Sequence, residues 1–224
     1  MIRFPSDTQR HAIIGETGSG KTQAGLWHLS RRNFHQYPWL IYTRKGDESI
    51  DGIPGAFEIG LNEIPGDRGV YITKPLPHEE DEVESQMWEI WKRGNTGLFI
   101  DEGYMIPKNQ KAFRAILTQG RSKHIPIITL SQRPVWMDRF VLTESEYHQI
   151  FHVGHEDDIK ELRKFIGDRE LNAGLHKAIQ ELPEFHSIYH DKGQRKMAKL
   201  SPVPRIEQIH ATFARRLGRQ RKVV

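Results

Sequence analysis

Residues 15 to 22 read Gly-Glu-Thr-Gly-Ser-Gly-Lys-Thr, which matches the phosphate-binding loop pattern G-x-x-x-x-G-K-[ST]. The three glycines are expected to adopt backbone conformations closed to other residues and to let the main chain approach a phosphate group. The backbone N–H groups of such a loop, together with the N-terminus of the following helix, bind an anion. Lys21 is expected to reach the β- and γ-phosphates of a nucleotide, and the Thr22 hydroxyl to hold Mg²⁺. The predicted nucleotide-binding residues are Gly15, Glu16, Thr17, Gly18, Ser19, Gly20, Lys21 and Thr22.

The segments on either side of this loop have the character that a phosphate-binding loop needs. Residues 11 to 14, His-Ala-Ile-Ile, predict a short buried strand, and residues 23 to 33 predict a helix. A strand, a glycine-rich loop and a helix in this order form the structural context in which the pattern binds nucleotide. A glycine-rich turn with an incidental lysine is the alternative interpretation.

A second polar motif follows a later strand. Residues 97 to 101, Gly-Leu-Phe-Ile-Asp, predict a strand that ends at Asp101, with Glu102 directly after it. In an ATP site the aspartate positions Mg²⁺, and an adjacent carboxylate can polarise the attacking water. Because the pair follows a phosphate-binding loop, we interpret it as the second half of an ATP site in which Thr22 and Asp101 hold the metal. Two solvated acids at a strand end are the alternative.

A third polar position lies at the end of another strand. Residues 125 to 130, Ile-Pro-Ile-Ile-Thr-Leu, predict a strand, and Ser-Gln-Arg-Pro follows it. In P-loop enzymes with a strand inserted between the two motif strands, the polar residue at the tip of the inserted strand faces the γ-phosphate. Gln132 holds that position, and we expect it to sense the phosphate or orient water.

Strand and helix patterns alternate along the chain, which predicts an α/β fold with a mainly parallel sheet flanked by helices. A short segment at 56 to 59 is expected to form an edge strand, and the last strand is expected to be antiparallel. The predicted strands span residues 11–14, 39–43, 56–59, 70–73, 97–101, 125–130, 147–153 and 184–189. The predicted helices span residues 23–33, 78–93, 108–118, 156–165 and 171–182.

Composition narrows the class of protein. The 224 residues are 37% hydrophobic and 28% charged, which is typical of a globular chain with one core. The chain has no cysteine, which excludes disulfides and thiolate zinc sites. No apolar run approaches the ~18 residues of a membrane helix, and the first residues lack the apolar core of a signal peptide. We therefore expect an intracellular protein without an integral membrane span.

Charge is distributed unevenly along the chain. From Lys192 to Val224 there are ten Lys or Arg residues and one Glu, a charge of +9, so the preceding 191 residues carry −5. We predict an ATPase domain over residues 1 to 200 and a basic tail over residues 201 to 224. In the tail, apolar residues at 206, 209, 213 and 217 share one helical face. Such a helix can dock on a neighbouring subunit, on DNA, on a membrane surface or on its own chain.

Two groups of side chains favour structural interpretations over a bound group. Trp88 and Trp91 are predicted to lie in the core or in a subunit contact rather than in a cofactor site. His148, His152 and His155 raise the possibility of a metal site, but the chain has no cysteine and no obvious fourth ligand. Surface or hydrogen-bonded histidines are the favoured interpretation.

The three motifs together resemble the FtsK/HerA superfamily of P-loop motor ATPases. Within that superfamily the chain is most similar to the small genome-packaging ATPases of tailless, membrane-containing viruses. The resembling segments are residues 15–22, 98–102 and 119–134, and the most specific part is Gln-Gly-Arg, a strand, and then Ser-Gln-Arg-Pro. The turn at Lys45, Gly46 and Asp47 also resembles the family, although Thr43 stands where an acid is usual. The similarity covers most of residues 10 to 155, and the last seventy residues do not align by eye.

The resemblance implies a RecA-like core, assembly into a ring, with a hexamer as the expected form, and nucleotide sites at subunit boundaries. It makes Glu102 the catalytic base, Gln132 the sensor, and Arg121 the arginine finger of the adjacent subunit; Arg133 is a second candidate for the finger, and a plain surface arginine is the alternative. A finger stabilises charge that develops on the transferred phosphate. The implied partners are double-stranded DNA and capsid or vertex proteins, and the expected location is the virion or the host cytoplasm. Lys108 and Lys111 are candidate DNA contacts.

The function predicted from the sequence is therefore an ATP-driven DNA translocase that packages a viral genome into a preformed capsid. One alternative is the same motor in conjugation, chromosome segregation or repair. Another is a P-loop kinase or a nucleotide-dependent switch. The Asp-Glu pair and the strand that ends in Gln favour hydrolysis by water over transfer to an acceptor.

Overall fold

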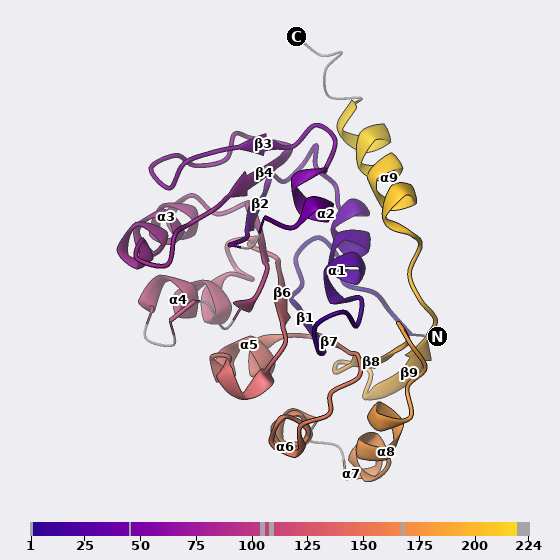
Figure 1. Cartoon of the computed structure of the whole chain (residues 1–224). Helices are drawn as coiled ribbons and strands as arrows, with labels where there is room; N and C mark the ends of the chain where they lie inside the picture. Colours follow the sequence, from indigo (N-terminus) through magenta and orange to yellow (C-terminus); the bar gives the residue numbers. More distant parts are fainter. Residues whose placement is uncertain (1, 45, 104–105, 108–109, 167–168, 219–224) are drawn as a thin grey trace.

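The computed structural model describes residues 2–44, 46–103, 106–107, 110–166 and 169–218 (Figure 1). Within these residues nine strands form one sheet in the order β3-β4-β2-β5-β6-β1-β7-β8-β9. The pairs from β3 to β7 are parallel, and β8 and β9 continue the sheet in antiparallel fashion. The strands are β1 His11–Ile14, β2 Trp39–Tyr42, β3 Phe57–Glu58, β4 Val70–Thr73, β5 Gly97–Ile100, β6 Ile127–Ser131, β7 Tyr147–Ile150, β8 Ser187–Asp191 and β9 Lys196–Leu200.

Helices cover both faces of the sheet, as Figure 1 shows. Helices α3, α4, α5, α6 and α8 bury apolar side chains on one face, and α1, α2 and α9 do so on the other. The helices are α1 Lys21–Ser30, α2 Glu48–Asp51, α3 Glu80–Arg93, α4 Lys111–Gln119, α5 Arg139–Glu144, α6 Glu156–Phe165, α7 Arg169–Ala173, α8 Leu175–Gln180 and α9 Ile206–Gly218, with a 3₁₀ turn at Pro134–Trp136. The predicted α/β class is confirmed.

The central strands bury residues on both faces because helices lie over each of them. In β1, Ile13 points toward α1, whereas Ala12 and Ile14 point into the opposite layer. This alternation follows from the two-residue period of a strand, and burial on both sides explains why these strands are continuous apolar runs in the sequence.

The topology brings the predicted motifs to one edge. Strand β6 lies between β5 and β1, and all three run parallel. Their carboxyl ends therefore lie next to one another, and ligands of open α/β sheets bind at that edge. The loop after β1, the acids after β5 and the glutamine after β6 are consequently neighbours.

The second half of the chain differs from the sequence-based expectation in several elements. Strand β9 was not predicted, because it is a partly exposed edge strand with lysines at 196 and 199 rather than an apolar run. The helix expected over 171 to 182 is divided at Gly174 into α7 and α8. The helix expected from 108 begins as α4 at Lys111, and Lys108 lies outside the described residues.

The tail helix α9 packs against its own chain, beside α1. Its apolar side chains Ile209, Phe213 and Leu217 are buried, and the ring of Phe213 stacks on that of Phe34 at 5.7 Å. Intramolecular packing was one of the options left open by the sequence. Residues 219 to 224 lie outside the described residues. Of the helices that are described, none has the length and apolar character to cross a lipid bilayer.

Candidate active site

The loop after β1 has the backbone of an anion cradle. Gly18 and Gly20 have φ angles of +79° and +97°, a region that side-chain-bearing residues avoid. Gly15 differs from the expectation, because its φ is not positive. It is required by close packing instead: a Cβ at Gly15 would lie 2.5 Å from Cβ of Phe151 and 2.7 Å from Oγ of Ser19.

The start of the loop is held to the ends of the two strands that flank β1. The Gly15 N–H donates to the carbonyl of Ser131, 3.2 Å away at the end of β6. The Glu16 carboxylate accepts from the Gly154 N–H at 2.6 Å and lies 3.4 Å from Nδ1 of His152, just after β7. Sequence reasoning gave no role to His152 in the loop, because this contact joins residues 136 positions apart.

The loop lysine is buried and points back into the loop. Lys21 is 6% exposed, and its Nζ donates to the carbonyl of Glu16 at 2.9 Å. It opens α1, so its charge lies at the helix N-terminus beside the glycine turn. A glycine-rich turn at a helix N-terminus with one ammonium suits a polyphosphate. Thr22 follows in the first turn of α1 and is partly buried.

The two acids after β5 are held by separate partners. The Thr43 hydroxyl donates to Oδ2 of Asp101 at 3.1 Å. Thr43 was noticed in the sequence only as a departure from the family's usual acid. Here it is fully buried at the end of β2, and it orients the carboxylate predicted to face Mg²⁺.

Glu102 and Gln132 meet directly. The Gln132 side-chain amide donates from Nε2 to Oε1 of Glu102 at 2.6 Å, which joins the tips of β5 and β6. Glu102 is 5% exposed and has a φ of +62°, which is unfavourable for a glutamate. Close packing requires a glycine at the next position, because a Cβ at Gly103 would lie 2.4 Å from Cγ2 of Thr129. Backbone strain of this kind is found where a side chain must point in one functional direction.

The two candidate arginine fingers differ in their surroundings. Arg133 forms an ion pair with the buried Asp158 at 2.5 Å, and its guanidinium lies 4.8 Å from the ring centre of Trp136. Arg121 is exposed in the turn between α4 and β6, and it has no ion pair with any residue that the structure describes. That turn is at the amino edge of the sheet, so Arg121 does not join the site of its own chain.

The remaining candidates have structural surroundings. His148 is buried, with Nε2 2.8 Å from the Leu142 carbonyl and Nδ1 3.2 Å from Nδ1 of His190. Burial lowers the pKa of His148 to about 4. Trp88 and Trp91 are partly buried against the core and meet edge to face at 5.6 Å. Within the described ranges, no group of three or more His, Asp or Glu residues could hold a metal by itself.

Comparisons with known proteins agree with this architecture. No family model matches the chain. The chain is 43% identical over 225 residues to the DNA packaging ATPase P9 of Enterobacteria phage PRD1, with 99% of this chain and 98% of that protein covered. Among solved structures it is similar to the genome packaging NTPase B204 of Sulfolobus turreted icosahedral virus 2 in complex with AMPPCP, with a TM-score of 0.70, 16% identity, and 89% and 100% of the two chains covered.

A second solved structure from another source shares the same fold. VirB4 of Thermoanaerobacter pseudethanolicus superposes with a TM-score of 0.65 at 10% identity, covering 91% of this chain and 92% of that one. Likeness at such identities concerns the fold, whereas the 43% match spans the whole chain. The loop, the two strand tips and this full-length match lead to one conclusion: the chain belongs to the viral DNA-packaging ATPases.

Proposed function

We propose that this protein hydrolyses ATP at the loop of residues 15–22 and uses the cycle to move double-stranded DNA into a viral capsid. The full-length similarity to a phage DNA packaging ATPase supports the task. The observation that carries the chemistry is the 2.6 Å hydrogen bond between Gln132 and Glu102 at the edge where the phosphate loop begins. It links a carboxylate able to take a proton to an amide able to bind phosphate or water.

The residues fit a magnesium nucleotide. Mg²⁺ is bound in such sites by one or two oxygen side chains together with substrate phosphates, and Thr22 and Asp101 offer a hydroxyl and a carboxylate. The bound ion would neutralise charge on the β- and γ-phosphate oxygens. Lys21 would exchange its bond to the Glu16 carbonyl for phosphate oxygens, and Thr43 would keep Asp101 in one orientation.

Hydrolysis would then proceed by attack of water on the γ-phosphorus. Glu102 accepts a proton from that water while the water oxygen forms its bond to the γ-phosphorus. At the same time the bond between the γ-phosphorus and the bridging oxygen of the β-phosphate breaks. Gln132 holds Glu102 through Oε1 and reports the state of the γ-phosphate to β6. The products are ADP and inorganic phosphate.

A ring of copies, which we propose to be a hexamer, would complete the site. Arg121 is exposed at the opposite edge from its own loop, which suits a finger that acts in a neighbour, whereas Arg133 is engaged with Asp158. Large apolar side chains are exposed in the segment that follows β6: Trp136 is 50% exposed and Phe140 is 39% exposed. Surfaces of this kind favour subunit contacts. Trp136→Glu is expected to reduce assembly, measured by light scattering.

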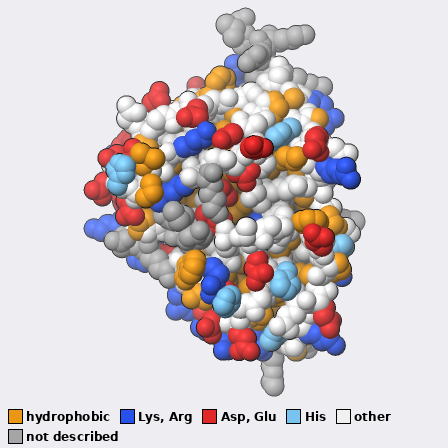
Figure 2. Space-filling view, in the orientation of Figure 1, with side chains coloured by type: hydrophobic (Ala, Val, Ile, Leu, Met, Phe, Trp, Pro, Cys, Tyr) orange, Lys and Arg blue, Asp and Glu red, His pale blue; other side chains and the backbone are white. Residues whose placement is uncertain are grey.

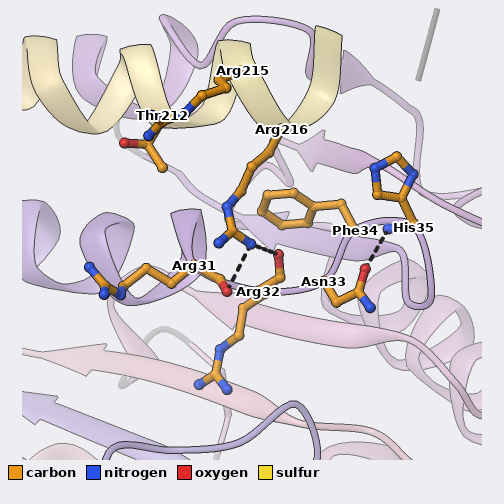
Figure 3. A pocket seen from close by; sticks show the side chains of 8 residues that line it. All are labelled: Arg31, Arg32, Asn33, Phe34, His35, Thr212, Arg215 and Arg216. Carbon is orange, nitrogen blue, oxygen red and sulfur yellow. Dashed lines mark hydrogen bonds between the residues drawn. The ribbon is translucent and has the colours of Figure 1, made fainter. Parts of the chain in front are cut away.

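The basic tail is the proposed DNA contact. On the face shown in Figure 2, acidic and basic side chains are interspersed. Between α1 and α9, by contrast, a hollow of about 470 Å³ is lined by Arg31, Arg215 and Arg216 and by no carboxylate. Figure 3 shows these side chains coming from the two helices, with Arg216 bonded to the carbonyls of Arg31 and Arg32. We infer that phosphates of DNA contact the arginines of this hollow. We also infer that the protein acts in the infected host cell during assembly and docks at a capsid vertex in the virion.

The proposal is tested by phosphate release with and without double-stranded DNA. We expect DNA to stimulate the parent protein, Lys21→Ala to lose nucleotide binding, and Glu102→Gln to bind ATP without turnover. Glu89→Gln, on the exposed face of α3, is the matched control and should behave as the parent. Equal rates for parent, Lys21→Ala and Glu102→Gln would refute the assignment.

A further inference from the structure

A second hollow lies directly beside the phosphate loop. Its volume is about 410 Å³, and it begins at the last glycine of the loop and the first turn of α1. Four of the lining side chains are aromatic or aliphatic, and none is a carboxylate. The lining residues are Gly20, Gln23, Phe151, Phe185, Pro202, Val203 and Arg205.

Phe185 is the unusual residue of this hollow. It is 46% exposed and has a φ of +59°. A large aromatic residue is rare in the left-handed region, and this conformation costs free energy that a glycine there would not. The strained turn does not bury the ring. It positions the ring against the loop instead, since a Cβ added at Gly20 would lie 3.3 Å from Cδ1 of Phe185.

Phe185 and the buried Phe151 also line a smaller hollow of about 250 Å³, together with residues 16 to 19 of the loop. Phe185 therefore lies beside both the first and the last part of the loop. Retained strain at an exposed side chain next to a binding loop indicates a contact that is completed by a ligand.

The far wall of the larger hollow belongs to the segment that leads into α9. Residues 202 to 205, Pro-Val-Pro-Arg, run past the loop helix, and Gln23 Nε2 donates to the carbonyl of Pro204 at 2.8 Å. Two prolines stiffen this segment. The Arg205 side chain is exposed at the rim and makes no ion pair with any part of the chain that the structure describes.

We propose that this hollow binds the base of the nucleotide, with its ring stacked on Phe185, Val203 and Phe151 as apolar walls, and the Arg205 guanidinium over its open side. The inference rests on the proposed ATP site, because the loop must hold the triphosphate for the base to reach the hollow. Flat aromatic and guanidinium groups stack on any base. Because residues 202–205 lead directly into α9, a base bound in the hollow would also stabilise the position of the segment that connects the basic tail helix to the ATPase body.

The test compares binding of ATP with binding of inorganic tripolyphosphate, both with magnesium. We expect Phe185→Ala to weaken ATP binding by roughly 5- to 150-fold, as expected for loss of one stacked base, and to leave tripolyphosphate binding unchanged. Phe185→Trp should retain ATP affinity. Phe57→Ala removes a comparably exposed phenylalanine, 54% exposed on edge strand β3, and serves as the control.

A second variant separates ligand contact from folding. Phe185→Gly removes the left-handed strain, so the thermal midpoint of the nucleotide-free protein should stay the same or rise, while the increase caused by ATP should shrink. Unchanged ATP affinity in Phe185→Ala, or an equal loss of ATP and tripolyphosphate binding, overturns the base site. If the parent protein binds neither ligand, the phosphate loop assignment fails instead.

Discussion

Replacing Gln132 with leucine tests the link between the two strand tips. The variant removes the donor of the 2.6 Å bond to Glu102 while keeping a side chain of similar size. A hydrogen bond to a charged group contributes about 1.5–3 kcal/mol. If that bond orients the base in the transition state, its loss lowers kcat by roughly 10- to 150-fold.

The same variant should change ATP affinity little, because the phosphate cradle is built from other residues. The Gly15 N–H is held by the Ser131 backbone carbonyl, and Lys21 opens α1. We therefore expect kcat to fall while KM stays within about twofold, the pattern of an interaction made in the transition state.

Steady-state phosphate release and equilibrium ATP binding measure the two quantities separately. Gln36→Leu removes an exposed glutamine between α1 and β2, away from the carboxyl edge that carries the site. It should leave both the rate of phosphate release and the affinity for ATP unchanged. A Gln132→Leu protein with parental kcat would show that the bond to Glu102 has no part in turnover.

Three further outcomes follow from buried contacts. Thr43→Val removes the hydroxyl that donates to Asp101. Loss of such a supporting bond typically weakens metal binding about 10- to 100-fold, so the Mg²⁺ concentration that gives the half-maximal ATPase rate should rise. Thr43→Ser keeps the hydroxyl and should behave as the parent. Burial lowers the pKa of His28 to about 3 and that of His148 to about 4. Below pH 6.5 the unfolded state therefore binds more protons than the folded state, so the free energy of unfolding is largest above that pH and falls by about 2 kcal/mol per histidine at pH 5. The fall is measured as a lower urea midpoint. A pH-independent midpoint between 8 and 5 would contradict this. Phe213→Ala leaves a cavity under α9 where the ring stacks on Phe34, and should lower the free energy of unfolding by about 3–5 kcal/mol in a chemical unfolding experiment. Ala214→Ser, at an exposed position of the same helix, should leave that free energy nearly unchanged.

The site divides into parts that are satisfied within one chain and one part that is not. Asp101, Glu102 and Lys21 all have partners in the same subunit. The proposed finger Arg121 lies at the other edge of the sheet. In the ring that we propose, each site would hydrolyse ATP only when a neighbour supplies Arg121, which would couple turnover to assembly.

Much of the fold and the catalytic edge could be predicted because the signals are local. The apolar runs at 11–14, 39–42, 70–73 and 97–100 correspond to β1, β2, β4 and β5, because strands buried on both faces must be apolar throughout. The exposed hairpin strand β9 has no such run and was missed. The break at Gly174 between α7 and α8 was also missed, although a glycine inside a helical pattern is a local signal for a helix end.

Sequence alone determined that a glycine loop, an Asp-Glu pair and a glutamine follow three strands, since backbone sterics and the apolar demand of a covered parallel sheet leave local patterns. Only the tertiary structure decided that Gln132 bonds Glu102, that Thr43 orients Asp101, that Arg133 is engaged by Asp158, and that Phe185 lies against Gly20. Each of these contacts joins residues at least 25 positions apart in the chain, as the 30 positions between Gln132 and Glu102 illustrate. Such contacts depend on how the strand order and side-chain packing bring distant segments together, which no local pattern encodes.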